Sequence, residues 1–462
     1  MKESLNKRQR GRHSDEPKSD AEADDILCYM DQASFVGLRA LERQPVLHFT
    51  WIYPHFLDEA VVNQFNDRLA QGLLGRVLQR SPLPWGRHRW VARTVPAPVT
   101  WHTAPMPLER LADCRTDLVN LPIDPEHGPA WRLVVQSLEG GGCALSILVS
   151  HTIADGKAAS QAIADAVAGR RFDRTFPPPS SRWSLRMIVR DIWECGRELP
   201  AVLLALIALL RSSGSTAISL SRGSSSLNLI GDEKPEPIML VPLVQVVMDS
   251  ASFRERAADL AITSNMLLAT LTVRIAFRIG RLDADGRVKL VLPVSERQPN
   301  DLRGNALRSI TLMVDPNAYL TNPRALQNEI KAALVKLPHQ VDSMEGMLPL
   351  IPYVPLKLAR RLAHQIVGGD LPVGCSLVSD LPLEIHHPFG EVSGFQFSAL
   401  ECFTESQLEK MGGILLVVGS RRGSQEFISV LGYAPNTIKT RAELTPFVCE
   451  ALNDLGLNGS VN

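Results

Sequence analysis

The sequence lacks the patterns that mark several common classes of protein. Its seven cysteines are scattered and include no Cys-x-x-Cys pair, so a disulfide framework, a zinc site and a thiol redox motif are not indicated. Lysine and arginine together number 49, as do aspartate and glutamate, so no net charge draws the chain to nucleic acid. A reducing cytoplasm is the expected setting, and peripheral attachment at a membrane is left open.

Long apolar runs are also absent. A membrane-spanning helix needs roughly 20 apolar residues, and the strongest run, at 199–210, is shorter and contains Pro200. We expect this run to form a buried bridging helix, with a surface that touches lipid as the alternative. Residues 1–25 are basic and then acidic without an apolar stretch, so they are predicted to be a disordered tail and not a signal peptide.

Common catalytic signatures are missing as well. No Gly-x-Ser-x-Gly elbow, phosphate-binding loop or Gly-x-Gly-x-x-Gly fingerprint occurs, so hydrolase, kinase and dehydrogenase functions lose their usual support. His364 and the pair His386 and His387 have no partner at a metal-ligand spacing, and Cys375 has no motif-linked base. We therefore expect no metal site and no cofactor.

What the sequence does contain is the composition of an ordinary globular protein. Its 462 residues are 45% apolar and 21% charged, which is enough for two domains that each bury a core. Helix-like and strand-like segments alternate through both halves, which predicts an α/β class with two similar lobes. The predicted organisation is a tail at 1–25, an N-terminal lobe at 26–170, a crossover linker with the apolar helix at 171–237 and a C-terminal lobe at 238–462.

Individual elements are predicted from periodicity and turn residues. Strands at 131–138 and 143–150 flank a glycine-rich turn and form a hairpin, and a helix follows at 157–167. In the second half, Ser252 and Glu255 have the spacing of a helix capping box. Further predicted elements are a helix at 57–79, a strand at 238–248, helices that end near 260 and 279, and strands at 288–294 and 307–314.

The segment His151-Thr152-Ile153-Ala154-Asp155-Gly156 carries the clearest chemical pattern. His151 follows the second strand of the hairpin, and sites often lie at the carboxyl end of a strand. A histidine held there can keep one imidazole nitrogen available as a general base for a hydroxyl group. Asp155 is suited to fix the loop by accepting hydrogen bonds, and Gly156 lets the backbone turn without a side chain. On this pattern alone, a structural loop with a satisfied histidine is an equal alternative.

Five further segments occur in order along the chain. They are Met30-Asp31-Gln32-Ala33-Ser34-Phe35, Gly128-Pro129-Ala130-Trp131, Ser264-Asn265-Met266-Leu267-Leu268-Ala269, Pro293-Val294-Ser295-Glu296-Arg297 with Gly304-Asn305, and Val378-Ser379-Asp380-Leu381-Pro382. Together with the His151 segment they resemble the HxxxDG acyltransferases, which have the chloramphenicol-acetyltransferase-like or condensation-domain-like fold. Among these, the sequence is most similar to the bacterial wax ester synthase/diacylglycerol acyltransferase group.

The resemblance implies a fold and a set of roles. It implies two lobes with mixed sheets and flanking helices, and a tunnel between the lobes with His151 at its middle as the catalytic base. Asp155, Gly156 and Arg297 would support the site structurally, with Arg297 as the ion-pair partner of Asp155. The residues that would line the substrate tunnel are Ser150, Asn265, Asn305 and Ser379.

Three positions depart from the family pattern. Ser150 stands where many relatives have a first histidine, Met266 replaces an aspartate, and Ala130 replaces a leucine. Because the second histidine is the base in the family, His151 still supports activity, whereas the acceptor specificity is open to change.

Three functions follow from this interpretation. The first is transfer of a long-chain acyl group from acyl-CoA, as substrate, to a hydroxyl-bearing lipid such as a fatty alcohol or a diacylglycerol. The second is a freestanding condensation-type enzyme that takes its acyl group from an acyl-carrier protein and forms an ester or amide in natural-product biosynthesis. The third is a non-catalytic member of the fold. Contact with a membrane or lipid droplet is left open, and no nucleic-acid partner is expected.

Overall fold

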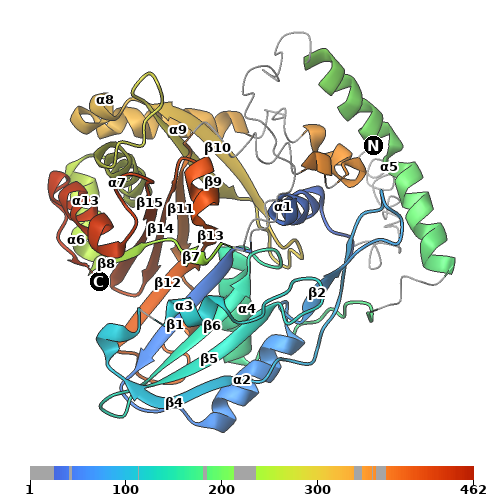
Figure 1. Ribbon diagram of the computed structural model, residues 1–462, viewed down its shortest axis with the longest axis horizontal. Coiled ribbons are helices and arrows are strands. Elements are labelled where there is room, and N and C mark those ends of the chain that lie inside the picture. The colour runs from blue at the N-terminus through green and yellow to red at the C-terminus, as the bar shows by residue number, and fades with distance from the viewer. Residues whose placement is uncertain are drawn as a thin grey trace, which may run out of the picture.

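The computed structural model describes residues 25–40, 44–112, 114–179, 185–212, 236–337, 346–355, 357–359 and 371–461. Almost all of the predicted tail, the stretch 213–235 and His364 therefore lie outside the described residues. Two sheets lie side by side, and helices cover their outer faces (Figure 1). The fold is thus the predicted class of two α/β lobes with mixed sheets and flanking helices.

The first lobe is built on a five-stranded sheet. Its order is β12-β1-β6-β5-β4, with all neighbours antiparallel except β4 and β5. The strands are β1 (Val46–Tyr53), β4 (Thr100–Met106), β5 (Trp131–Leu138), β6 (Cys143–Ser150) and β12 (Gly394–Leu400). Around it lie α1 (Tyr29–Ala40), α2 (Glu59–Gln71), η2 (Leu108–Arg110), α3 (Arg115–Val119), α4 (Gly156–Ala168) and the small pair β2 (Arg76–Gln79) and β3 (Arg89–Ala92).

The second lobe is built on a seven-stranded sheet. Its order is β10-β9-β11-β14-β15-β8-β16, and β11 runs parallel to both of its neighbours. The strands are β8 (Leu243–Asp249), β9 (Val288–Ser295), β10 (Leu307–Val314), β11 (Val373–Asp380), β14 (Ile414–Arg422), β15 (Gln425–Tyr433) and β16 (Ser460–Val461). Its helices are α6 (Ser250–Asp259), α7 (Ser264–Arg278), α8 (Pro316–Thr321), α9 (Pro323–Lys336), α12 (Glu405–Lys410) and α13 (Arg441–Asp454). Two short 3-10 helices from this half of the sequence pack on the first lobe instead: η5 (Leu348–Tyr353) on α1 and η6 (Leu383–Ile385) on α4.

The two lobes share part of the chain at their junction. Strand β12 falls by sequence in the predicted C-terminal lobe, 238–462, but it pairs with β1 of the first sheet from Val46 opposite Leu400 to Ile52 opposite Gly394. The short strands β7 (Ile238–Leu240) and β13 (Cys402–Thr404) form a second link between the halves. The segment after β11 therefore crosses from one lobe to the other.

Most predicted elements are present, and the differences have local causes. The hairpin strands are β5 and β6 with the predicted bounds, and the turn places Gly140 and Gly141 at positive φ. The helix expected at 57–79 ends at Gln71, because glycines at 72 and 75 interrupt it and 76–79 form β2. The strand expected at 238–248 is divided into β7 and β8.

The predicted capping box is also wrong. Helix α6 begins at Ser250, and Asp249 is its N-cap, whose carboxylate accepts a hydrogen bond from the backbone N–H of Ser252 at 2.7 Å. Ser252 therefore lies inside the helix and does not cap it. The following helix, α7, is capped by Thr263, whose hydroxyl accepts a hydrogen bond from the backbone N–H of Met266.

The apolar run at 199–210 differs most from its predicted burial. It belongs to α5 (Leu185–Ser212), a helix of 28 residues that lies along the edge of the molecule (Figure 1). The side chains of Leu203 and Leu204 are 50% and 68% exposed, whereas Ala205 is buried. The expectation of a buried bridging helix is therefore wrong for this face.

No single helix among the described residues is both long and apolar enough to cross a membrane. Helices α6 and α7 meet the length and composition criteria only as a pair bent by 83°, and most of α7 is packed in the core of the second lobe.

Candidate functional site

His151 lies at the junction of the two lobes, immediately after the buried strand β6. Its backbone N–H donates to the carbonyl oxygen of Pro45 at 3.0 Å, and its own carbonyl oxygen accepts a hydrogen bond from the Asn305 side chain at 3.2 Å. The residue is half-buried. Within the described part of the chain, no hydrogen bond is made by its imidazole. The main chain of His151 is thus fixed from both sides, while its ring makes no hydrogen bond to the described residues.

Asp155 fixes the other end of the loop. Its carboxylate is 1% exposed and caps α4, because one oxygen accepts from the backbone N–H of Ala158 at 2.8 Å. The second oxygen accepts from Arg297 at 2.7 Å and from the backbone N–H of Ala306 at 3.0 Å. Asp155 therefore bonds to its own helix and to the second lobe, and its geometry is that of a structural residue.

Arg297 distributes its guanidinium over several acceptors. Besides Asp155, it donates to the carbonyl oxygens of Asp301, Arg303 and Gly304 at 3.1, 3.0 and 2.9 Å. The contact that the resemblance implies between Asp155 and Arg297 is present. One planar side chain therefore connects the loop after β9 to the His151 loop. A guanidinium can bond several acceptors at once in a fixed geometry, which a lysine ammonium cannot do as well.

Asp31, which the sequence interpretation did not assign to the site, connects α1 to the same loop. Its carboxylate is 1% exposed and accepts from the backbone N–H groups of Gly304 and Asn305 at 2.9 and 2.6 Å. Burial raises the pKa of Asp31, and the two N–H groups act in the opposite direction. Asp31 belongs to the segment that resembles the family opening, but nothing in the sequence indicates its partners 273 positions away.

Arg76 is the second buried charge that the sequence did not reveal. It is fully buried at the start of β2 and donates to the carbonyl oxygen of Ile153, within the His151 loop, at 2.8 Å. Its guanidinium lies 4.0 Å from the ring centroid of Trp90. Burial lowers the pKa of Arg76 to about 9, and the carboxylate of Asp31 acts in the opposite direction. The His151 loop is thus held by Arg76 of β2 as well as by residues of the second lobe.

The glycines of the site provide space. A Cβ atom at Gly156 would lie 3.2 Å from the side chain of Val378 on β11. At Gly304, a Cβ atom would lie 2.9 Å from the carbonyl oxygen of Thr152 and 3.1 Å from Asp31. The two lobes therefore approach so closely at the loop that these positions accept no larger residue without movement.

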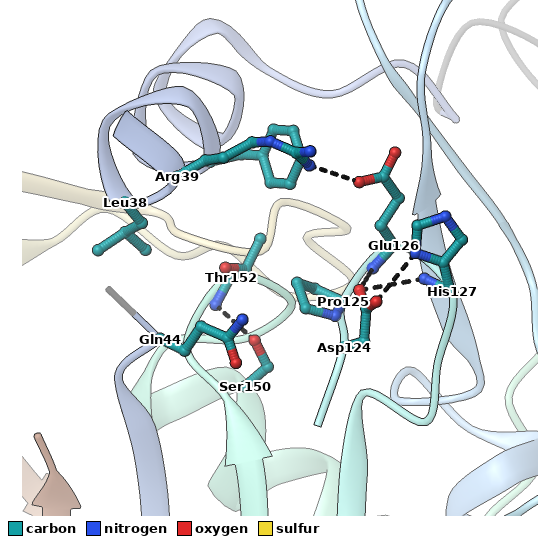
Figure 2. A pocket seen from close by; sticks show the side chains of 10 residues that line it. Leu38, Arg39, Gln44, Asp124, Pro125, Glu126, His127, Ser150 and Thr152 are labelled. Carbon is teal, nitrogen blue, oxygen red and sulfur yellow. Dashed lines mark hydrogen bonds and ion pairs between the residues drawn. The ribbon is translucent and has the colours of Figure 1, made fainter. Parts of the chain in front are cut away.

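A cavity of about 430 Å³ opens beside the loop, between α1 and the turn at 124–127. Ser150 and Thr152, the neighbours of His151, lie at its floor, and Arg39 and Glu126 meet across its upper side (Figure 2). The remaining lining residues are Phe35, Leu38, Gln44, Asp124, Pro125 and His127. The cavity therefore combines an apolar wall from α1 with polar groups from the turn.

The charges around this cavity are largely paired. Glu126 accepts from Arg39 at 2.8 Å and from Arg80 at 2.7 Å. Burial raises the pKa of Glu126, against the influence of Arg39. The exposed His127 bonds to Asp124 at 2.9 Å, and this hydrogen bond raises the pKa of His127. The described residues contain no cluster of three or more His, Cys, Asp or Glu side chains that could hold a metal ion.

The four residues predicted to line a tunnel lie in different places. Ser150 lines the cavity, and Asn305 bonds to the main chain of His151. Ser379 lies on β11, and the placement of its side chain is outside the description. Asn265 is exposed in the first turn of α7 and is not among the described residues that bond to the His151 loop. Their part in a tunnel stays a prediction.

Comparison with known proteins identifies the fold but not a family. No family model matches the chain, and no curated protein matches its sequence. Among solved structures, polyketide synthase associated protein 5 from Mycobacterium tuberculosis is 16% identical with a TM-score of 0.53, covering 93% of this chain and 97% of its own. The first condensation domain of the CDA synthetase is 12% identical with a TM-score of 0.54, covering 93% and 96%.

A third similar structure is that of F. sporotrichioides TRI101 complexed with coenzyme A and T-2. It is 11% identical with a TM-score of 0.55, and the likeness covers 95% of this chain and 99% of that protein. The chain therefore shares the two-lobed fold of condensation domains and chloramphenicol-acetyltransferase-like proteins along nearly its whole length. At these identities the likeness concerns the fold alone.

Proposed function

We propose that this protein is an acyltransferase in which His151 is the general base. The observation that carries the proposal is the arrangement of the loop after β6. Its main chain is held by Pro45, Asn305 and Arg76, while the imidazole has no hydrogen-bond partner among the described residues. An imidazole on a firmly held main chain, with no hydrogen-bond partner of its own, is suited to take a proton from a bound substrate.

The proposed reaction needs one proton acceptor and no covalent enzyme intermediate. The acceptor hydroxyl transfers its proton to the imidazole as its oxygen attacks the carbonyl carbon of a thioester. The tetrahedral adduct then collapses, the carbon–sulfur bond breaks, and the thiolate takes up the proton from the imidazolium. Ester and free thiol are the products, and His151 returns to its neutral form.

For the substrates, we propose acyl-CoA as donor and a hydroxyl-bearing lipid as acceptor, as in the wax ester synthase/diacylglycerol acyltransferase group. Two observations support this choice. The segment containing His151, Asp155 and Gly156 is complete, and one protein of the same fold was solved with coenzyme A bound. Asp155, Gly156 and Arg297 act as supports, because all three hold the loop and none needs to touch the substrate.

A second donor has support of its own. The likeness to a condensation domain of a peptide synthetase is as extensive as the likeness to the coenzyme A complex, with TM-scores of 0.54 and 0.55. An acyl group on the phosphopantetheine arm of a carrier protein would present the same thioester to His151. The two donors differ only in what surrounds the reacting bond, so offering each donor to the enzyme separately distinguishes them.

The test measures thiol release and lipid product together, using palmitoyl-CoA with hexadecanol or a diacylglycerol. We expect acceptor-dependent release in the wild-type protein and a loss of about 10² to 10⁴ in kcat for His151→Ala. The matched control is His102→Ala, since His102 is exposed on β4 and should leave the rate unchanged. Transfer from an acyl-carrier protein but not from acyl-CoA would select the second donor. An unchanged rate in His151→Ala would overturn the proposal.

A further inference from the structure

Helix α5 is attached to the molecule by its charged face. Arg89, which is 1% exposed on β3, bonds to Glu194 at 2.7 Å and to Asp191 at 3.3 Å. Arg87 bonds to Glu198 at 2.5 Å. These three carboxylates are all the acidic residues of the helix, so its entire negative charge is directed at the body of the protein.

The opposite face of α5 is apolar and exposed. With about 100° of rotation per residue, the exposed large apolar positions fall within an arc of about 160°. The paired carboxylates lie on the other side of the helix. The nine side chains of this outer face, each between 43% and 81% exposed, are Leu185, Val189, Ile192, Trp193, Leu199, Leu203, Leu204, Leu206 and Ile207. The helix is therefore oriented opposite to an ordinary surface helix, which buries its apolar side.

One margin of this outer face carries the exposed Arg197. Arg190 lies near the same margin by helical rotation, but it pairs with Glu194 at 3.0 Å and is directed at the body of the protein. The guanidinium of Arg197 lies 5.7 Å from the ring centroid of Trp193. An apolar face with tryptophan and arginine at its margin is the arrangement of helices that lie in the headgroup region of a membrane.

We propose that the outer face of α5 docks this protein on a lipid bilayer that contains anionic headgroups. The apolar side chains would enter the acyl region, and Arg197 beside Trp193 would meet the phosphate layer. The chain as a whole has 49 basic and 49 acidic residues, so net charge would not add to the attraction of Arg197 for anionic headgroups.

A protein partner fits the same face less well. Protein interfaces form about one hydrogen bond per 100–200 Å² of buried area, but residues 199–210 offer no polar side chain over three turns of helix. The hydrocarbon region of a bilayer forms no hydrogen bonds, so an entirely apolar surface suits it.

The position of α5 links this surface to the candidate site. Helix α5 packs against η5, and η5 packs against α1, with η5 drawn between the two helices in Figure 1. A second cavity of about 300 Å³ lies between α1 and η5 and shares Phe35 and Arg39 with the cavity beside the loop. If the proposed function holds, docking through α5 brings this side of the site to the membrane from which a lipid acceptor would come.

The experiment is flotation of the full chain with vesicles. We expect binding to phosphatidylcholine vesicles with about 30% phosphatidylglycerol and weaker binding to phosphatidylcholine alone. The double variant Leu203→Ser, Ile207→Ser should reduce the affinity by at least about 10-fold, since both side chains would otherwise be buried in the bilayer. The matched control is Val335→Ser, an exposed apolar residue of α9 that is 72% exposed and should not alter binding.

The other outcomes contradict the proposal. Absence of binding to either vesicle, or equal binding by the double variant, would overturn it. A wild-type dimer that the double variant dissociates, without vesicle binding, would assign the face to a second copy. His151→Ala should bind vesicles like the wild-type protein, so a failure of docking can be told apart from a failure of the proposed catalysis.

Discussion

Asn305 donates its side-chain amide to the carbonyl oxygen of His151 at 3.2 Å, although 154 positions separate the two residues. The backbone N–H of Asn305 is in turn held by the carboxylate of Asp31 at 2.6 Å. One chain of hydrogen bonds therefore runs from α1, through the loop of the second lobe, to the main chain of the proposed base. The placement of His151 depends on both lobes and on the first helix.

The first prediction concerns Asp31. Asp31→Ala leaves the buried N–H groups of Gly304 and Asn305 without their acceptor, and each unsatisfied group costs about 1–3 kcal/mol. We expect a loss of a few kcal/mol in the free energy of unfolding, measured in urea, together with a fall in kcat that exceeds the change in KM. Asp31→Asn retains one acceptor oxygen and should recover part of both. Equal stability of Asp31→Ala and the wild type would contradict this role.

The second prediction concerns the pair of Arg297 and Asp155. Arg297→Lys keeps the charge but cannot reach all four acceptors of the guanidinium, so its cost should lie below the value of about 3–5 kcal/mol for removing one partner of a buried pair. Urea unfolding should show most of this loss. Arg170→Lys is the control, because Arg170 pairs with Asp165 and Glu384 at the surface, where such a change is worth less than about 1 kcal/mol. Similar losses of unfolding free energy in both variants would contradict the prediction that the Arg297–Asp155 pair stabilises the fold more than a surface pair does.

Local sequence signals were sufficient for the elements that bring His151 to its place. The hairpin of β5 and β6 and the helix α4 each follow from a period of apolar residues and from the turn or cap next to it. The likeness of the fold also followed from the ordered segments. By contrast, the pairing of β12 with β1 and the bonds of Asp31 join residues hundreds of positions apart. Such contacts depend on tertiary packing and leave no local pattern.

The error at α5 has a different physical origin. Its apolar content favoured burial, but a helix is oriented by the partners of its polar side chains as well as by its apolar ones. Arg87 and Arg89, more than a hundred positions earlier, capture the carboxylates of α5 and turn the apolar side outward. Composition alone did not reveal these partners.

The third prediction compares two glycines of the site. In Gly304→Ala the added Cβ would meet the carbonyl oxygen of Thr152 at 2.9 Å, and a backbone atom cannot move aside cheaply, so we expect a loss of about 1–3 kcal/mol. Gly156→Ala meets the side chain of Val378 at 3.2 Å and should cost less. The control is Gly196→Ala on α5, where no atom lies within 4 Å of the added group. It should be neutral or stabilising by up to about 1 kcal/mol. Thermal or urea unfolding gives the order of the three variants.

The fourth prediction concerns pH and rests on His48. This side chain is 2% exposed on β1 and bonds through one ring nitrogen to Thr50 at 2.7 Å and to Ser146 at 3.2 Å. Burial lowers the pKa of His48 to about 3, whereas a histidine in an unfolded chain has a pKa of about 6.5. At pH values between about 3 and about 6.5, His48 binds a proton in the unfolded state but not in the folded state. The free energy of unfolding therefore rises with pH across this interval and is reduced as the pH falls below about 6.5.

The size of the effect makes it measurable. At pH 5.0 the unfavourable protonation of His48 should reduce the free energy of unfolding by about 2 kcal/mol relative to pH 7.5, at about 1.4 kcal/mol per unit below the unfolded pKa. His48→Gln keeps a polar side chain but cannot titrate, so this part of the pH dependence should disappear from its urea unfolding curves. His102→Gln, an exposed residue of β4, should leave the slope as it is in the wild type. If His48→Gln also keeps the wild-type slope, the acid sensitivity has another source, because a neutral side chain at position 48 cannot contribute to it.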